Sequence, residues 1–209
     1  MHIVVIGATG RTGRAVVEQA LGHGDEVVAF ARQPERLELS HPRLTLAPGD
    51  VRELDSLRAA LVGAEGVVSV IGAAPGREVD TYSVGMGNIM QAMIESDVPR
   101  LAVMSASGTF NRSSRNLTMG YRLMMKATLG GLYDDLERME QRIMASQLEW
   151  TIVRAAGLTD GPFTGVYRIG DHGKPLANGQ RVSRADVAAL LLKSLYTDRW
   201  LRRAVTVAY

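Results

Sequence analysis

Three glycines at regular spacing are the residues of this chain that point most directly to chemistry. Gly7, Gly10 and Gly13 follow an apolar run in the stretch IVVIGATGRTG, residues 3–13. The first glycine allows a tight turn, the second lets the main chain approach a phosphate, and the third lets a following helix pack close to the strand. The N–H groups and the positive dipole end of that helix attract anions. The pattern therefore predicts a turn that holds the diphosphate of a dinucleotide.

The end of the next predicted strand, residues 26–32, indicates which dinucleotide is bound. An acidic residue at this position accepts hydrogen bonds from the adenosine ribose of NAD. This chain has Arg32 there instead, with Arg36 one turn further on. A guanidinium group binds a phosphate bidentately, so we expect NADP(H) to be preferred over NAD(H). In the alternative interpretation, both arginines are solvated surface charges.

Two further turns are predicted to contact the cofactor. Asp50 directly follows the third predicted strand, where its carboxylate can accept a hydrogen bond from the adenine amino group or act as an ordinary turn residue. Gly72 and Ala73 follow the fourth predicted strand. Small residues there allow the backbone to pass close under a cofactor, although a plain loop would have the same composition.

Other catalytic groups are missing from the sequence. None of the six tyrosines is followed four residues later by a lysine, so the Tyr-x-x-x-Lys pair that makes a phenol a general acid at neutral pH is absent. Alcohol oxidation and sugar epimerisation are therefore not expected. The chain has no cysteine, and its four histidines have no metal-ligand spacing, so we expect neither thiolate chemistry nor a metal site.

Apolar and aromatic residues in the second half are predicted to face a substrate. Residues 108–131 are rich in methionine and include Phe110 and Tyr121, and Phe163 and Tyr167 follow later. Such side chains form an adaptable wall that suits a flat conjugated molecule, or they pack as a lid on the core or on a second subunit. Arg154, at the end of an apolar strand, either pairs with a carboxylate or approaches the cofactor.

The composition predicts one soluble domain over residues 1–209. The chain is 46% hydrophobic and 22% charged, and its formal charge of +2 disfavours nucleic acid as a partner. No apolar run reaches the roughly 18 residues that cross a membrane. The chain enters a strand at once rather than showing a signal peptide, so we expect a cytoplasmic protein, either a monomer or a homodimer.

Strands alternate with helices along the chain, which predicts an α/β protein with a doubly wound parallel sheet of the Rossmann type and a small C-terminal lobe on the substrate side. We expect strand order 3-2-1-4-5-6, with the ligand crevice at the carboxyl ends of the strands. Residues 108–131 and 157–182 are expected as excursions over this crevice.

Asp134 and Asp135 are expected near the start of a helix, where they favour its dipole. The predicted elements after the second strand are helix 34–39, strand 43–46, helix 54–61, strand 66–71, helix 81–96, strand 100–104, helix 133–146, strand 150–154, helix 184–196 with Ser183 as its N-cap, and a strand 204–208 that closes the edge of the sheet.

Four segments together resemble the atypical short-chain dehydrogenase/reductase superfamily. They are GATGRTG at residues 7–13, GDV at 49–51, MSASG at 104–108 and WTIVRAAGLTDGPFTGVYR at 150–168. Within the superfamily, the chain is most similar to the biliverdin reductase B (flavin reductase) group and to NmrA-like NAD(P)H-binding proteins. The resemblance implies that the 2′-phosphate is bound by Arg32, that adenine is flanked by Asp50 and Val51, that Gly72 lies beside the nicotinamide ribose, and that the pyrophosphate is held by Gly7, Thr9, Gly10, Arg11, Thr12 and Gly13.

The chain departs from that group at two positions. The serine that the group carries after the fifth strand falls on Ala106, between Ser105 and Ser107, and its substrate-side histidine falls on Gly157. Proton donation by those two groups therefore does not carry over. Ser105, Ser107 and Tyr133 remain candidate catalytic residues, and Ser105 is also a candidate cofactor contact.

Two functions are compatible with these residues. The first is an NADPH-dependent reductase that passes a hydride to a flavin, a quinone or a similar conjugated molecule, because solvent can then supply the proton. The alternative is a non-catalytic NAD(P)H-binding redox sensor or regulatory protein of the NmrA type, whose excursion at 108–131 meets a protein partner.

Overall fold

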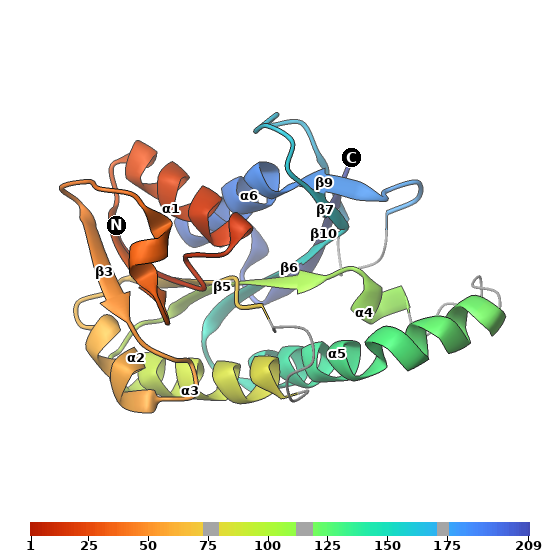
Figure 1. The fold of residues 1–209 in the computed structure, drawn as a ribbon, viewed down its shortest axis with the longest axis horizontal. Coiled ribbons are helices and arrows are strands. Elements are labelled where there is room, and N and C mark those ends of the chain that lie inside the picture. The colour runs from red at the N-terminus through yellow and green to blue at the C-terminus, as the bar shows by residue number, and fades with distance from the viewer. Residues whose placement is uncertain (73–79, 112–118, 171–175) are drawn as a thin grey trace.

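The computed structural model describes residues 1–72, 80–111, 119–170 and 176–209, and the side chains of all of these except residues 110–130. An eight-stranded sheet forms its centre (Figure 1). The spatial order of its strands is β3 (Leu44–Pro48), β2 (Glu26–Ala31), β1 (His2–Ile6), β4 (Gly66–Ser69), β5 (Arg100–Ala106), β6 (Glu149–Ala155), β10 (Arg203–Ala208) and β8 (Arg168–Gly170). Every neighbouring pair is parallel except β10 and β8. The predicted order 3-2-1-4-5-6 is confirmed.

The expected edge strand is wrong, because β10 lies between β6 and β8. Strand β8 closes this edge and comes from the segment 157–182, in which no strand was predicted. It has only three residues and a single partner strand, so its sequence carries little periodic signal. A separate pair of short parallel strands, β7 (Gly157–Thr159) and β9 (Arg181–Ser183), forms the small lobe.

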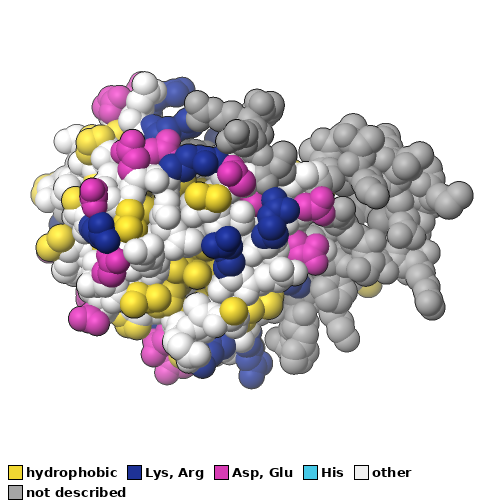
Figure 2. Space-filling model, turned by 90° about the horizontal axis from the view of Figure 1, so that it is seen from below, with side chains coloured by type: hydrophobic (Ala, Val, Ile, Leu, Met, Phe, Trp, Pro, Cys, Tyr) yellow, Lys and Arg dark blue, Asp and Glu magenta, His cyan; other side chains and the backbone are white. Residues whose placement is uncertain are grey.

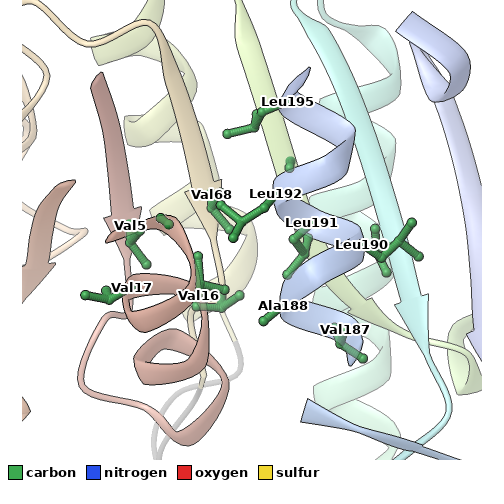
Figure 3. Close-up of a cluster of buried hydrophobic side chains, with 14 of the residues drawn as sticks. Val5, Val16, Val17, Val68, Val187, Ala188, Leu190, Leu191, Leu192 and Leu195 are labelled. Carbon is green, nitrogen blue, oxygen red and sulfur yellow. The ribbon is translucent and has the colours of Figure 1, made fainter. Parts of the chain in front are cut away.

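Helices cover both faces of the sheet, because the strands are apolar on both sides. On β1, Ile3 and Val5 face one core, whereas Val4 and Ile6 face the other. The first core is covered by α1 (Arg11–His23) and α6 (Arg184–Tyr196), whose packing is shown in Figure 3. The second is covered by α2 (Leu54–Ala60), α3 (Thr81–Glu95) and α5 (Met119–Ala145). Short helices complete the fold at Pro34–Leu37, at Gly108–Asn111 (α4) and at Asp198–Trp200.

Helix α6 begins as predicted, because the Ser183 hydroxyl accepts a hydrogen bond from the Asp186 N–H at 3.0 Å.

Helix α5 differs from its prediction. It begins at Met119 rather than near Tyr133, so residues 119–131 belong to a helix that packs along α3 and extends beyond the sheet (Figure 1). The paired glycines 130 and 131 lower helix propensity by about 1 kcal/mol each but do not end the helix.

The face formed by α2, α3 and α5 has a mixed surface. Figure 2 shows acidic, basic and apolar side chains interspersed on its described part. Arg58 of α2 pairs with Glu95 of α3 at 2.6 Å and with Asp55 at 2.7 Å, and the Arg58 guanidinium lowers the pKa of the Glu95 carboxyl. These ion pairs are exposed and add little to stability. Among the described helices, none combines the length and the apolar character needed to cross a bilayer.

Candidate dinucleotide-binding site

A cleft of about 200 Å³ lies at the carboxyl ends of β1, β2, β3 and β4. The strand order reverses between β1 and β4, and ligands of doubly wound sheets bind at such a reversal. The residues that line the cleft are Gly7, Thr9, Gly10, Phe30, Ala31, Arg32, Gly49, Asp50, Val51, Arg52, Val70, Ile71, Gly72 and Thr81.

The glycine turn has a shape that other residues would disrupt. Gly7 adopts a φ of +87°, and a Cβ on it would lie 2.8 Å from the carbonyl oxygen of Val70. A Cβ on Gly13 would lie 2.2 Å from the Gly7 carbonyl oxygen, so this glycine allows α1 to approach the turn. Gly10 is the N-cap of α1 and leaves the first N–H groups of the helix without a side-chain cap. Such N–H groups, at a positive dipole end, form an anion site.

Two other residues of the turn lie away from the cleft lining. Thr12 is buried in the first turn of α1. Arg11 is exposed, and its guanidinium bonds the Asp160 carboxylate at 2.8 Å. Asp160 also accepts a hydrogen bond from Arg184 at 2.5 Å. In this structure Arg11 therefore joins the glycine turn to the loop after β7.

Just beyond the carboxyl end of β2, Arg32 lines the cleft, is exposed and forms no ion pair or side-chain hydrogen bond with any described residue. Arg36 is also exposed but does not line the cleft. Asp50 serves as a turn residue as well as a cleft residue, because its carboxylate accepts the Arg52 N–H at 3.0 Å. Arg52 also forms an ion pair with Asp80.

Val51 is held against α3. A Cβ on Gly85 would lie 2.8 Å from the Val51 side chain, and the Asn88 amide donates a hydrogen bond to the Val51 carbonyl at 2.9 Å. Gly49 is equally constrained, since a Cβ there would lie 2.5 Å from the buried Phe30 ring. Val51 and Phe30, two apolar residues of the cleft lining, are therefore fixed by close contacts, Val51 with α3 and Phe30 with Gly49.

The carboxyl end of β5 carries the candidate catalytic residues. Ser105 is 5% exposed, and its hydroxyl has no hydrogen-bond partner among the described residues. The Ser107 N–H donates to the Ala155 carbonyl at 2.9 Å, which extends the pairing of β5 and β6. The Tyr133 ring packs on Gly108, where a Cβ would lie 2.6 Å from the ring. Ala73 and the side chains of Phe110 and Tyr121 lie outside the described part of the chain.

Of the two interpretations of Arg154, the structure shows the ion pair. Arg154 is 8% exposed and its partner Glu140 is 3% exposed. Nε lies 3.0 and 3.1 Å from the two carboxylate oxygens, and Nη2 lies 2.5 Å from Oε2. A buried bidentate pair of this kind keeps the guanidinium away from a substrate and makes it part of the framework.

The remaining substrate-side candidates lie in the small lobe and do not line the cleft. Phe163 is 60% exposed, and burial raises the pKa of the half-buried Tyr167 phenol, with a smaller contribution from the Asp186 charge. The loop between them is anchored by buried Asp186, which accepts hydrogen bonds from the N–H groups of Thr164 and Gly165, both at 2.9 Å. No described part of the structure brings three or more metal-ligating side chains together.

Sequence reasoning missed several residues of the site. Phe30 and Ile71 were detectable, because they stand at the carboxyl ends of β2 and β4 as Arg32 and Gly72 do. Arg52 and Thr81 carried no such signal, since their approach to the cleft depends on how two turns are packed. Asp135 was expected near the start of its own helix, and this is wrong. It lies within α5 and accepts hydrogen bonds from the first amides of α3.

Comparisons with known proteins agree with this geometry. The model of a family described as "NAD(P)H-binding" matches residues 7–198. "Oxidoreductase AgnL4" of Paecilomyces divaricatus is 26% identical over 157 residues, which cover 68% of this chain and 60% of that protein. "Photosystem II assembly factor Ycf39" of a Synechocystis strain is 23% identical over 227 residues, which cover 99% of this chain and 62% of that protein. The chain thus spans about 60% of the length of these relatives.

The fold itself recurs in solved structures. A short-chain dehydrogenase/reductase (wide type) from Veillonella parvula, crystallised in complex with NADP, is 20% identical and superposes with a TM-score of 0.83. The superposition covers 100% of this chain and 94% of that one. The family model spans nearly all of the chain, and the strand order and the glycine turn are those of a dinucleotide-binding fold. The chain therefore belongs to the NAD(P)H-binding family.

Proposed function

We propose that this chain is an NADPH-dependent reductase that passes a hydride to a flavin, a quinone or a similar conjugated small molecule. The observation that carries the cofactor preference is Arg32, a guanidinium in the lining of the cleft with no ion-pair partner among the described residues. The end of β2 has no carboxylate, which would repel a 2′-phosphate bound there.

The residues present fit a dinucleotide. The glycine turn keeps its shape only because Gly7 and Gly13 have no Cβ, which would collide with the backbone of Val70 and of the turn, and the orphaned Ser105 hydroxyl is a buried group in need of a polar partner. In the proposed complex, the turn holds the diphosphate, Arg32 the 2′-phosphate, and Asp50 with Val51 the adenine. Ser105 would bond a polar group at the nicotinamide end. When bound, the reduced nicotinamide supplies the hydride.

The protein's part in the reaction is positioning rather than proton transfer. The Tyr-x-x-x-Lys pair is absent from the sequence, and Arg154 is held by Glu140. A conjugated ring is a suitable acceptor for such a site, because it takes a hydride without a protein acid while solvent supplies the proton. The similarity to a protein named an oxidoreductase, AgnL4, and to a Veillonella parvula structure that holds NADP supports this proposal.

A second candidate is a non-catalytic NAD(P)H-binding regulatory protein. The absence of a general acid favours it, and so does the similarity to a protein named an assembly factor, Ycf39. Turnover separates the two candidates. NADPH consumption is measured at saturating cofactor with FMN, riboflavin, menadione and dichlorophenolindophenol. Oxidation with at least one acceptor supports the reductase, whereas NADPH binding without turnover of any acceptor supports the regulatory protein.

Arg32 itself is tested by Arg32→Ala. Loss of one charge-assisted hydrogen bond costs about 1.5 to 3 kcal/mol, so NADPH affinity should fall roughly 10- to 100-fold while NADH affinity stays within about twofold. Arg203→Ala is a matched control, because Arg203 is exposed at the start of β10, at the opposite end of the parallel strands. Fluorescence titration with both nucleotides gives the dissociation constants. Equal losses for NADPH and NADH would remove Arg32 from this role.

A further inference from the structure

Helix α5 carries two carboxylates that are buried far more than carboxylates usually are. Asp135 is 1% exposed and Glu140 is 3% exposed. Burial of a charge is costly unless the charge is paired and hydrogen-bonded. The two residues are five positions apart, so their side chains leave the helix in directions about 140° apart. Each therefore bonds a different neighbour of α5.

Asp135 caps the helix that borders the cleft. Its carboxylate accepts hydrogen bonds from the N–H groups of Tyr82 at 2.7 Å and Ser83 at 3.3 Å, at the start of α3. Asp80, the N-cap residue of α3, makes no side-chain cap bond and is paired with Arg52. The first turn of α3, which includes the cleft residue Thr81, is therefore held by a carboxylate from another helix.

Glu140 fastens the turn that follows β5. Besides its bidentate bonds to Arg154, its Oε1 lies 3.4 Å from the Thr109 hydroxyl. That hydroxyl has a single proton, which it shares between the Ala106 carbonyl at 2.7 Å and the more distant Glu140 carboxylate. About two helical turns before Glu140, the Tyr133 ring covers Gly108 of the same loop. The stretch from Ala106 to Thr109 is thus held from α5 by the Thr109–Glu140 hydrogen bond and by the Tyr133 ring, while the Glu140–Arg154 ion pair ties α5 to the neighbouring strand β6.

We propose that residues 133–140 of α5 form a brace that sets the position of the turn after β5 relative to the first turn of α3. This inference rests on the proposed reductase function, in which the turn after β5 borders the nicotinamide end of the cofactor. The first turn of α3 borders the cleft through Thr81. Glu140 is in this sense a positioning residue. It acts through Thr109 and Arg154 on the backbone around Ser105 and does not itself touch the reacting atoms.

Thr109→Val tests the brace, because it removes the hydroxyl that links the turn to Glu140 and leaves the ion pair in place. Thr151→Val is the matched control. Thr151 is buried, whereas Thr109 is partly buried, and the Thr151 hydroxyl donates to the Trp200 carbonyl at 2.9 Å, at the other end of β6. Both variants lose a hydroxyl hydrogen bond to a backbone carbonyl, so both should lower the melting temperature, and Thr151→Val should do so at least as much.

Only Thr109→Val should affect the site. We expect kcat to fall about tenfold with the KM for NADPH unchanged, because a misplaced turn alters the reacting geometry and not the binding of the adenosine end. Amide hydrogen exchange of Ser107 should become faster in this variant alone, measured without substrate. Wild-type values of kcat and of Ser107 exchange in Thr109→Val, or the same changes in Thr151→Val, would overturn the brace.

The exchange measurement keeps this proposal separate from the reductase function. If the wild-type protein reduces no acceptor, the proposed function fails, and Ser107 exchange alone then decides the brace. Faster exchange in Thr109→Val but not in Thr151→Val supports it, and unchanged exchange refutes it. Glu140→Gln extends the test. Faster Ser107 exchange should recur in a folded Glu140→Gln protein, since the amide cannot hold the Arg154 guanidinium as a carboxylate does.

Discussion

Substituting Gly13 by alanine should disable the diphosphate cradle. The new Cβ would lie 2.2 Å from the Gly7 carbonyl oxygen and 2.9 Å from Cα and the carbonyl oxygen of Ala8. All three atoms belong to the backbone, so no flexible side chain can move aside. To reach ordinary van der Waals separation, the first turn of α1 must retreat by about 1 Å from the turn.

A retreat of this size affects stability and binding differently. Overpacking against a rigid backbone costs about 1 to 3 kcal/mol of the free energy of unfolding. N–H···O bonds weaken steeply outside about 2.7 to 3.2 Å, so a phosphate can no longer be held by the amides of the turn and of the helix together. The loss of one charge-assisted bond, about 1.5 to 3 kcal/mol, corresponds to a roughly 10- to 100-fold weaker affinity for NADPH and for NADH alike.

Gly22→Ala provides a control on the same helix. A Cβ on Gly22 would meet no atom within 4 Å, and the residue is exposed within α1. This substitution should raise the free energy of unfolding by about 0.5 to 1 kcal/mol and leave nucleotide affinity unchanged. Urea denaturation and fluorescence titration measure both quantities. Wild-type affinity in Gly13→Ala, or an equal loss of affinity in Gly22→Ala, would refute the reasoning.

Two other carboxylates give predictions of their own. Asp160→Asn removes the charge partner of exposed Arg11 and of the less exposed Arg184, so stability should fall by about 1 kcal/mol, while NADPH binding should stay the same or tighten because Arg11 is free to approach the phosphates. Weaker NADPH binding in a titration would contradict this. Burial of Asp186 raises the pKa of its carboxyl, but hydrogen bonds from Tyr209, Thr164 and Gly165 outweigh burial, and the net pKa is lowered. The carboxylate therefore stabilises the fold above the unfolded pKa of about 3.9, and this stabilisation is lost as the pH falls through the lower folded value. In urea denaturation, the advantage of the wild type over Asp186→Asn should be constant above about pH 5 and shrink below about pH 4, and a difference independent of pH would argue against it.

The glycine turn, the strand order and the N-cap of α6 could all be predicted from the sequence. Each depends on interactions between residues close together in the chain or on a periodic apolar pattern that a parallel sheet requires. Gly7 and Gly13 are six residues apart, and Ser183 bonds an N–H three residues on. The position of Arg32, Asp50 and Gly72 in the cleft lining could be predicted for the same reason, because they stand directly after strands whose carboxyl ends meet at one edge of the sheet.

The start of α5 was not predictable in this way. Residues 119–131 are helical although they contain a glycine pair, since the helix continues into a segment that buries Leu136, Met139 and Ile143 against the sheet. Helical stability in proteins comes mostly from such packing rather than from local propensity. The edge position of β8 has the same origin, because three residues gain a strand conformation only from their pairing with β10.

By itself, the sequence determined that this protein is a parallel α/β fold with a glycine turn after its first strand and an arginine after its second. Only the tertiary structure decided which polar groups became partners. Arg11 meets Asp160 across 149 residues, and Asp135 caps Tyr82 across 53. A charged side chain is compatible with many partners, and its position in the sequence does not specify which one it meets. Folding selects the partner, because every buried charge must be paired within the geometry that the packed helices and strands leave available.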